Sequence, residues 1–125
     1  MIPAPYVLIV EDDPDIRRLL VLRLKRAGAD VYGASTGEEG LTAAAARVPA
    51  LVLLDLHLPG IDGWEVITRL AAADRTARTP ILIVSIEDAP RSESPSVRGC
   101  LVKPFQGRDI DDAIRRILPL PGHAA

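Results

Sequence analysis

The sequence contains few aromatic residues and a single cysteine. Phe, Trp and Tyr make up only 3% of its 125 residues, so a hydrophobic core must be built from Val, Leu, Ile and Ala. Cys100 is the one cysteine, which excludes an internal disulfide bond. A lone free thiol is more typical of a reducing cytosol than of secreted proteins. Hydrophobic residues still reach 48%, and this length suits one domain that buries about two-thirds of its unfolded surface.

The chain also lacks a continuous basic run, a signal peptide and a long apolar segment. Its net charge is −2, and nothing in it resembles the basic footprint of a nucleic-acid binder. Residues 1–5 carry no basic segment followed by an apolar stretch. No apolar run approaches the roughly 18 residues that a membrane span needs. We therefore expect a cytoplasmic protein with no nucleic-acid partner and no membrane contact.

Short apolar runs alternate with segments of helical period. Residues 6–10 (YVLIV), 51–54 (LVLL) and 81–84 (ILIV) are almost continuously apolar and rich in β-branched residues. Such runs are typical of strands that are buried on both faces of a parallel sheet. Residues 30–33 and 99–102 are weaker strand candidates. The pattern predicts five strands.

Amphipathic segments follow the predicted strands. The first begins near Pro14 and ends at Gly28, and its many basic residues indicate a solvated face. Further helices are predicted over residues 38–47, 64–73 and 109–118, the first of them capped by Ser35 or Thr36. Between residues 87 and 98 the signal degrades, with two prolines and three serines, so a short or irregular fourth helix is the most that we expect there.

This alternation predicts an α/β fold. Right-handed crossovers favour a flavodoxin-like (βα)5 three-layer sandwich with a parallel five-stranded sheet of order 2-1-3-4-5. We expect a single domain over residues 1–125, with its core at about residues 5–118. Residues 119–125 are expected to be a disordered tail or the start of a linker.

Acidic residues follow two of the predicted strands. Glu11, Asp12 and Asp13 come after the first strand and Asp55 ends the third. These strands are neighbours in the expected order, so the carboxylates should converge at the carboxyl edge of the sheet, where such folds bind ligands. At about 4 Å and an effective dielectric near 20, each pair of carboxylates repels by roughly 4 kcal/mol. Oxygen ligands without sulfur or imidazole favour Mg²⁺, with Mn²⁺ as a substitute. Asp13 taken alone is better interpreted as a helix N-cap.

Two further polar residues follow strands four and five. Ser85 could bind an anion oxygen, and the Lys103 ammonium is a point charge suited to a phosphoryl group. In isolation each would be better explained as a capping hydroxyl or a solvated charge. Their placement at the same edge of the sheet favours membership of one site.

Three segments together carry a resemblance to a known family. Residues 8–14 (LIVEDDP), 53–63 (LLDLHLPGIDG) and 101–105 (LVKPF) resemble the signature segments of response-regulator receiver domains in two-component signalling. The resemblance extends from Tyr6 to Leu118. It implies a magnesium-dependent phosphorylation switch that is not an enzyme in the ordinary sense and only catalyses its own phosphorylation and dephosphorylation. Its phosphodonor partner would be a histidine kinase or a phosphotransfer protein.

The resemblance also assigns roles to individual residues. Asp55 would be the phosphoacceptor, and Asp12, Asp55 and the backbone carbonyl of His57 would bind Mg²⁺ directly. Glu11 would act through metal-bound water. Ser85 would be the switch hydroxyl and Lys103 would pair with phosphoryl oxygens. The Lys103–Pro104 bond is a candidate for a cis peptide.

The chain departs from the family pattern at three places. Ile86 follows the switch serine, where the family has a small residue. Cys100 stands where the family has an aromatic residue, and we expect it to be a buried, inert side chain. The segment between Ser85 and Lys103 is about one helical turn short. The usual dimer surface is therefore in doubt, and a homodimer would use a non-standard interface.

Two other functions remain open at this stage. A degenerate receiver could act as a phosphorylation-independent protein-interaction module, which the three departures favour. An enzyme of the same fold class, a flavodoxin or a haloacid-dehalogenase-type phosphatase, is disfavoured. A flavodoxin would need a hydroxyl- and glycine-rich phosphate loop after strand one, where this chain has acidic residues. The phosphatase would need an Asp-x-Asp nucleophile motif there, and Asp13 and Asp15 match that spacing only by chance around Pro14. The downstream partner cannot be named from the sequence.

Overall fold

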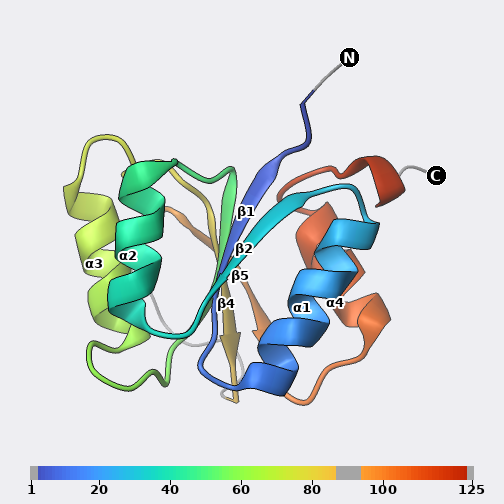
Figure 1. Cartoon of the computed structure of the whole chain (residues 1–125), viewed down its shortest axis with the longest axis horizontal. Helices are drawn as coiled ribbons and strands as arrows, with labels where there is room; N and C mark the ends of the chain where they lie inside the picture. The colour runs from blue at the N-terminus through green and yellow to red at the C-terminus, as the bar shows by residue number, and fades with distance from the viewer. Residues whose placement is uncertain (1–2, 87–93, 124–125) are drawn as a thin grey trace.

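Five parallel strands form one central sheet. The computed structural model describes residues 3–86 and 94–123. The strands are β1 (Tyr6–Val10), β2 (Asp30–Ala34), β3 (Leu51–Asp55), β4 (Ile81–Ser85) and β5 (Val97–Val102). Their order in the sheet is β2-β1-β3-β4-β5 (Figure 1). This confirms the predicted topology and places the two weaker strand candidates, β2 and β5, at the edges.

Helices cover both faces of the sheet. They are α1 (Pro14–Arg26), α2 (Gly37–Ala46), α3 (Gly63–Ala72) and α4 (Gly107–Arg115), so α4 is the helix predicted over residues 109–118. α2 and α3 lie on one face and α1 and α4 on the other, which gives the predicted three layers (Figure 1). Within the described residues, no helix is long and apolar enough to cross a membrane.

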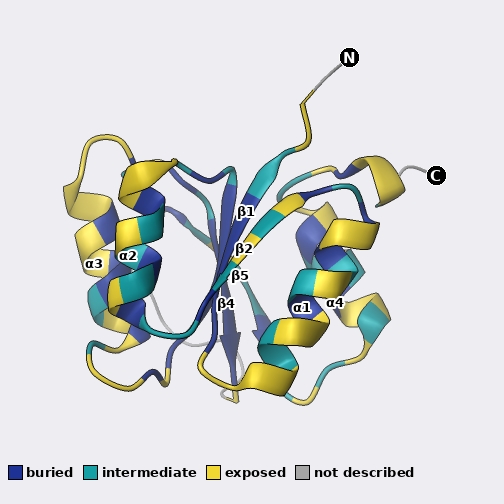
Figure 2. Ribbon diagram, in the orientation of Figure 1, coloured by how far each residue is buried: buried dark blue, intermediate teal, exposed yellow. Residues whose placement is uncertain are grey.

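The apolar runs fill two cores, one on each face of the sheet. Every residue of β3 and β4 is buried, and only the first residue of β1 is partly exposed (Figure 2). Alternate residues of these strands point to opposite faces and join either the α1/α4 core or the α2/α3 core. Each fully buried Leu or Ile stabilises the fold by about 1.5–3 kcal/mol. The carboxyl ends of β1, β3 and β4 are therefore held on a rigid frame.

Polar side chains begin the helices at the carboxyl edge of the sheet. Asp13 caps α1 by accepting hydrogen bonds from the amides of Asp15 and Ile16, at 2.8 and 3.1 Å. Thr36 caps α2 and Asp62 caps α3 in the same way. The cap interpretation of Asp13 is thus the one that the structure supports, and Thr36 rather than Ser35 caps the second helix.

The connection between β4 and β5 is described only in part. Residues 87–93, where most of the expected irregular fourth helix falls, lie outside the described residues. Residues 95 and 96 form a turn, and β5 begins at Val97. β5 therefore starts inside the segment that was expected to be helical.

Residues 120–123 pack against the rest of the chain, which differs from the expected disordered tail. Leu120 is 3% exposed and belongs to the α1/α4 core. The Gly122 amide donates to the carbonyl of Ala27 at 2.6 Å, and a Cβ on Gly122 would lie 2.6 Å from Ala27 Cα. The His123 ring nitrogen Nε2 lies 3.2 Å from Asp111 Oδ1. The prediction of disorder is wrong for residues 120–123 because an apolar residue and a glycine fit a groove that only the assembled helices create.

Candidate functional site

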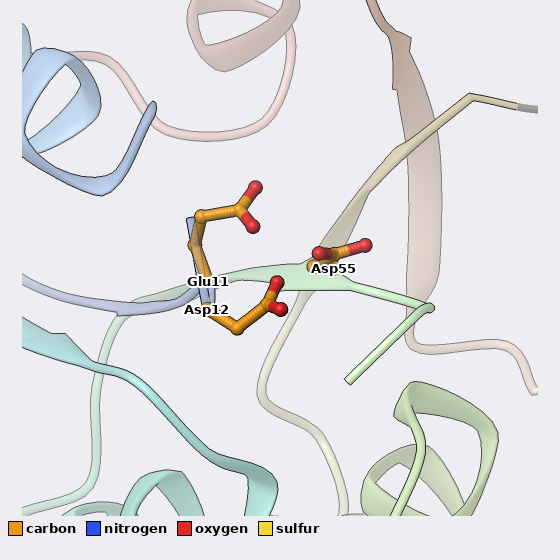
Figure 3. A group of neighbouring side chains, drawn as sticks. All are labelled: Glu11, Asp12 and Asp55. Atoms are coloured by element: carbon orange, nitrogen blue, oxygen red, sulfur yellow. The ribbon is translucent and has the colours of Figure 1, made fainter. Parts of the chain in front are cut away.

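Three carboxylates meet at the carboxyl edge of the sheet. Glu11 and Asp12 follow β1, and Asp55 ends β3 (Figure 3). One oxygen from each of the three side chains lies within 4.8 Å of the others. Glu11 and Asp55 are 1% and 3% exposed, whereas Asp12 is exposed to solvent. The predicted convergence of these acids is present in the structure.

Strand register produces this convergence. Val10 of β1 pairs with Leu54 of β3, so the next residue of each strand, Glu11 and Asp55, comes to the same level of the sheet. The Glu11 amide donates to the carbonyl of Ala34 at 3.0 Å, which extends the pairing with β2 past the end of β1. A buried sheet specifies register strongly because a slip of one residue would turn the apolar side chains to the wrong face.

The loop after β3 folds back closely beneath Asp55. The Gly63 amide donates to the carbonyl of Leu56 at 3.0 Å. A Cβ on Gly63 would lie 2.5 Å from the Asp55 carbonyl oxygen, so only glycine fits at this position. The His57 amide donates to Asp55 Oδ1 at 3.0 Å, while the His57 residue itself is exposed. These contacts orient the Asp55 carboxylate and leave its second oxygen facing the site.

Lys103 brings an ammonium group to the same carboxylates. Its Nζ lies 2.8 Å from Glu11 Oε1 and 3.5 Å from Asp55 Oδ2, and its side chain is 16% exposed. The Lys103 amide donates to the carbonyl of Ser85 at 2.8 Å, which ties the end of β5 to the end of β4. The Lys103–Pro104 peptide is cis, as predicted.

The site carries unbalanced negative charge. Burial, followed by the neighbouring Asp55 carboxylate, raises the pKa of Glu11 to about 7 against the opposing effect of Lys103. Burial lowers the pKa of the Lys103 ammonium, but the Glu11 and Asp55 carboxylates outweigh it and raise that pKa. The Lys103 ammonium pairs with two of the three clustered carboxylates, those of Glu11 and Asp55. Within the described part of the chain, Glu11 Oε1 is also buried without a well-oriented hydrogen bond.

These features fit a divalent hard cation. Carboxylate oxygens are the ligands that Mg²⁺ takes in proteins, usually through one or two carboxylates plus waters and phosphate oxygens. A cation here would offset the repulsion between the acids and could reach Glu11 Oε1, whose contact among the described residues is the ion pair with Lys103. The donor set contains no thiolate and no imidazole, which disfavours zinc.

Ser85 lies at the same edge. It is fully buried at the end of β4, and its neighbour Val84 pairs with Asp55 of β3. Ile86, the next residue, is 68% exposed. The strand order therefore puts the hydroxyl next to the acidic cluster and the bulky apolar side chain at the surface beside it.

Arg17 is a residue at this site that the sequence analysis missed. The pattern of α1 predicts a solvated basic face, and this face would include Arg17. Its guanidinium Nη1 instead donates to the main-chain carbonyls of Glu11 and Asp12, at 2.8 and 3.3 Å. Its spacing, one helical turn after the Asp13 cap, does not by itself fix the path of the side chain, so no local signal in the sequence identifies it.

Cys100 differs from the expectation in one respect. It is half-buried on β5 and not fully buried, and it packs partly against the α2/α3 core. A hollow of about 350 Å³ lies beside it, lined by residues of β5 and α4. The thiol is too small to occupy the volume of the aromatic side chain that is typical of the family at this position.

Comparisons with known proteins agree with the fold. A family model described as the response regulator receiver domain matches residues 7–115. The transcriptional regulatory protein AfsQ1 of Streptomyces coelicolor is 39% identical over 118 residues, which cover 91% of this chain and 51% of AfsQ1. The chain spans about half the length of the first curated regulators that it matches.

Solved structures give the same result. The chemotaxis response regulator CheY4 of Vibrio cholerae matches with a TM-score of 0.84 and 27% identity, covering 92% of this chain and 99% of CheY4. The response regulator protein TrrA of Thermotoga maritima, in complex with Mg²⁺-BeF, matches with a TM-score of 0.80 and 28% identity. That match covers 91% of this chain and 99% of TrrA.

Proposed function

Because the chain belongs to the response regulator receiver domain family, we propose that it is a signalling switch phosphorylated on Asp55. The phosphoryl group would come from a phosphohistidine of a histidine kinase or a phosphotransfer protein. The chain would act as a phosphoacceptor and not as an enzyme with a separate substrate. Its place of action would be the cytoplasm, as a single domain formed by residues 1–125, and its output would be a change of protein contacts.

One observation carries this proposal: a buried carboxylate, two neighbouring acids and one lysine ammonium lie together at the carboxyl edge of the sheet. Asp55 is held by the His57 amide on one oxygen and approached by Lys103 on the other. Glu11 and Asp12 supply oxygen ligands next to it. Phosphoryl transfer requires mainly positioning and neutralisation of charge, and this arrangement supplies both.

Asp12, Asp55 and the His57 carbonyl would hold Mg²⁺, with Glu11 acting through a metal-bound water. The TrrA structure, which is in complex with Mg²⁺-BeF, supports the choice of Mg²⁺ as the cation. When bound, the cation would neutralise charge on the transferring group. Manganese should substitute, because it accepts the same oxygen ligands.

In the reaction, an Asp55 carboxylate oxygen attacks phosphorus as the bond from phosphorus to the donor histidine nitrogen breaks. The nitrogen keeps the electron pair of that bond, and the ring leaves as neutral imidazole with a proton already on its other nitrogen. Lys103 moves its ion pairs from Glu11 and Asp55 toward the phosphoryl oxygens, where charge-assisted hydrogen bonds are strong. No proton has to leave Asp55, which attacks as the carboxylate.

Phosphorylation would then change the structure through Ser85 and Lys103. A phosphoryl group adds about −1.5 to −2 charge at neutral pH. Moving a two-state domain from 1:99 to 99:1 requires about 5.5 kcal/mol of differential interaction. A hydrogen bond from Ser85 to a charged oxygen, at about 1.5–3 kcal/mol, together with a relocated Lys103 pair, approaches that amount.

Labelling the whole chain tests this proposal. A phosphorylated histidine kinase or phosphotransfer protein carrying ³²P is mixed with the chain, with Mg²⁺ or with EDTA. We expect a label that requires Mg²⁺ and is released by hydroxylamine, as an acyl phosphate is. Magnesium binding without any transfer from a panel of kinases and from acetyl phosphate would instead favour the phosphorylation-independent interaction module, for which Ile86 and Cys100 are the motivating residues.

Ile86 should slow phosphorylation by small donors. Its side chain is 68% exposed and follows the buried Ser85 at the rim of the site. We expect Ile86→Ala to react with acetyl phosphate about threefold to tenfold faster, a barrier change of about 0.7–1.4 kcal/mol, with little change in the free energy of unfolding. Stopped-flow recording of Trp64 fluorescence or a phosphorylation-dependent gel shift would measure the rate. An Ile86→Ala variant that reacts no faster than the original chain would remove this idea.

A further inference from the structure

Arg17 binds the main chain of the loop between β1 and α1, which carries Glu11 and Asp12, and leaves their carboxylates free of its guanidinium. It lies on the first turns of α1 and is half-buried. Its Nη1 donates to the carbonyl oxygens of Glu11 and Asp12. We propose that Arg17 is a positioning residue for the cation site, which sets the geometry of Glu11 and Asp12 through their main chain. This inference rests on the proposed function, since it assigns the residue to the same site.

The contacts of Arg17 differ in kind from those of Lys103. Lys103 pairs with the carboxylate oxygens of Glu11 and Asp55, which are the atoms that a cation must reach. Among the described residues, the Arg17 side chain donates only to main-chain oxygens, so the carboxylates that it positions stay available. Its positive charge lies beside two acids and lessens their mutual repulsion without competing for ligand atoms.

The loop between β1 and α1 needs such a support. Glu11 and Asp12 follow the last residue of β1, and their carbonyls therefore lie beyond the end of the strand pairing with β3. The Arg17 amide also donates to the carbonyl of Asp13 at 2.9 Å, which closes the first turn of α1. Main chain and side chain of one residue thus bind three successive carbonyls, and this restrains the whole loop.

The neighbouring strand leaves room for the arginine stem. Gly33 on β2 faces α1, and a Cβ at this position would lie 3.2 Å from Arg17 Cγ and 3.3 Å from Arg17 Cδ. These distances are shorter than an ordinary van der Waals contact of about 3.5–4.0 Å between carbons. The absence of a side chain at Gly33 therefore allows the stem to pass along the strand and reach the end of β1.

Magnesium binding should depend sensitively on the position of this loop. Mg²⁺ requires nearly octahedral coordination at about 2.0–2.1 Å, so small displacements of Asp12 cost affinity. Partners that orient metal ligands typically change affinity by about 10–100-fold when they are removed. Since Arg17 acts through carbonyls and not on a ligand atom, we expect the lower end of this range.

The experiment compares Arg17→Gln with Arg18→Gln in the whole chain. Arg18 is the exposed neighbour on the same helix and makes no hydrogen bond or ion pair within the described residues. Magnesium is titrated calorimetrically, and hydrogen exchange of the Asp12 and Asp13 amides is measured in EDTA. We expect Arg17→Gln to raise the Kd for Mg²⁺ about tenfold and to speed exchange at both amides, while Arg18→Gln changes neither.

Two more variants separate positioning from stability. Arg17→Lys keeps the charge but loses the guanidinium fork, and its Kd should lie between those of the original chain and Arg17→Gln. Gly33→Ala, which crowds the stem and leaves Arg17 in place, should raise the Kd in the same direction. It keeps the test valid if Arg17→Gln does not fold.

The outcomes distinguish this inference from the proposed function. An original chain that binds no Mg²⁺ would overturn both. An original chain that binds Mg²⁺ while folded Arg17→Gln and Gly33→Ala bind it equally well would overturn the inference alone. The same holds if the loss of affinity disappears once the unfolded fraction, measured by urea titration, is taken into account.

Discussion

Replacing Asp55 by asparagine is expected to abolish phosphoryl uptake and to stabilise the Mg²⁺-free protein. The amide is nearly isosteric but is a poor nucleophile, so labelling from any donor should fall to background. The free energy of unfolding should increase, because the amide removes one of three crowded carboxylates. Each carboxylate pair at about 4 Å repels by roughly 4 kcal/mol, whereas Lys103 loses only its longer contact of 3.5 Å.

The net gain should be about 1–3 kcal/mol in the free energy of unfolding, because repulsion from two acids is removed and one attraction is lost. Urea titrations at pH 8 in EDTA would measure it. In saturating Mg²⁺ the original chain should be more stable than the variant, since a ligand that binds only the folded state stabilises the original chain and not the variant. Asp15→Asn, at an exposed acid in the first turn of α1, is the matched control and should show neither effect. A variant that is less stable than the original in EDTA would contradict this account of the site.

The second large expected effect is a loss of stability of the Mg²⁺-free protein as the pH rises. Glu11 has a pKa of about 7 in the folded protein because of burial and the nearby Asp55, while an unfolded glutamate titrates near pH 4.3. The folded state thus holds a proton that the unfolded state has lost. Its contribution to stability is fully present below about pH 4.3 and is lost as pH rises through 7. Without Mg²⁺, the protein should therefore become less stable between pH 5 and pH 8, by on the order of 2–3 kcal/mol.

Glu11→Gln should remove most of this slope. The amide keeps the shape of the side chain but does not titrate, so the difference between the two proteins isolates Glu11 from the two histidines of the chain. Unfolding free energies in EDTA at pH 5, 6, 7 and 8 would give both curves. Equal slopes for the two proteins would show that Glu11 does not carry an elevated pKa. Below pH 5 both proteins should lose stability for a different reason. The pKa of Glu39 is lowered, mainly by the hydrogen bond from the Ser35 amide, so the stabilisation from this ionised carboxylate is lost as the pH falls.

Much of the site could be predicted before any coordinates were known. Strands with uninterrupted apolar runs must be buried on both faces, and parallel strands bring their carboxyl ends to one edge. Given the order of the strands, the acids after β1 and β3 could only converge. The same rule predicts that Ser85 and Lys103, which follow β4 and β5, lie at that edge. The family resemblance added the roles of these residues, which the spacing alone does not supply.

Other features could not be predicted, because they depend on contacts between segments that are distant in sequence or on side-chain paths. A basic residue on an amphipathic helix usually faces water, and nothing local showed that Arg17 returns to the end of β1. The burial of Leu120 depends on a groove at the end of α1, and no local pattern signals that groove. In the same way, the elevated pKa of Glu11 arises from burial and from Asp55, which lies on a different strand.

The sequence by itself determined the order of the strands, the edge at which the polar residues gather and the kind of ligand that they suit, since these follow from hydrophobic periodicity and chain connectivity. Only the tertiary structure decided which charges touch, which carbonyls are restrained and how the last residues pack. Those properties depend on distances of a few ångströms between side chains, and such distances exist only after the layers have come together.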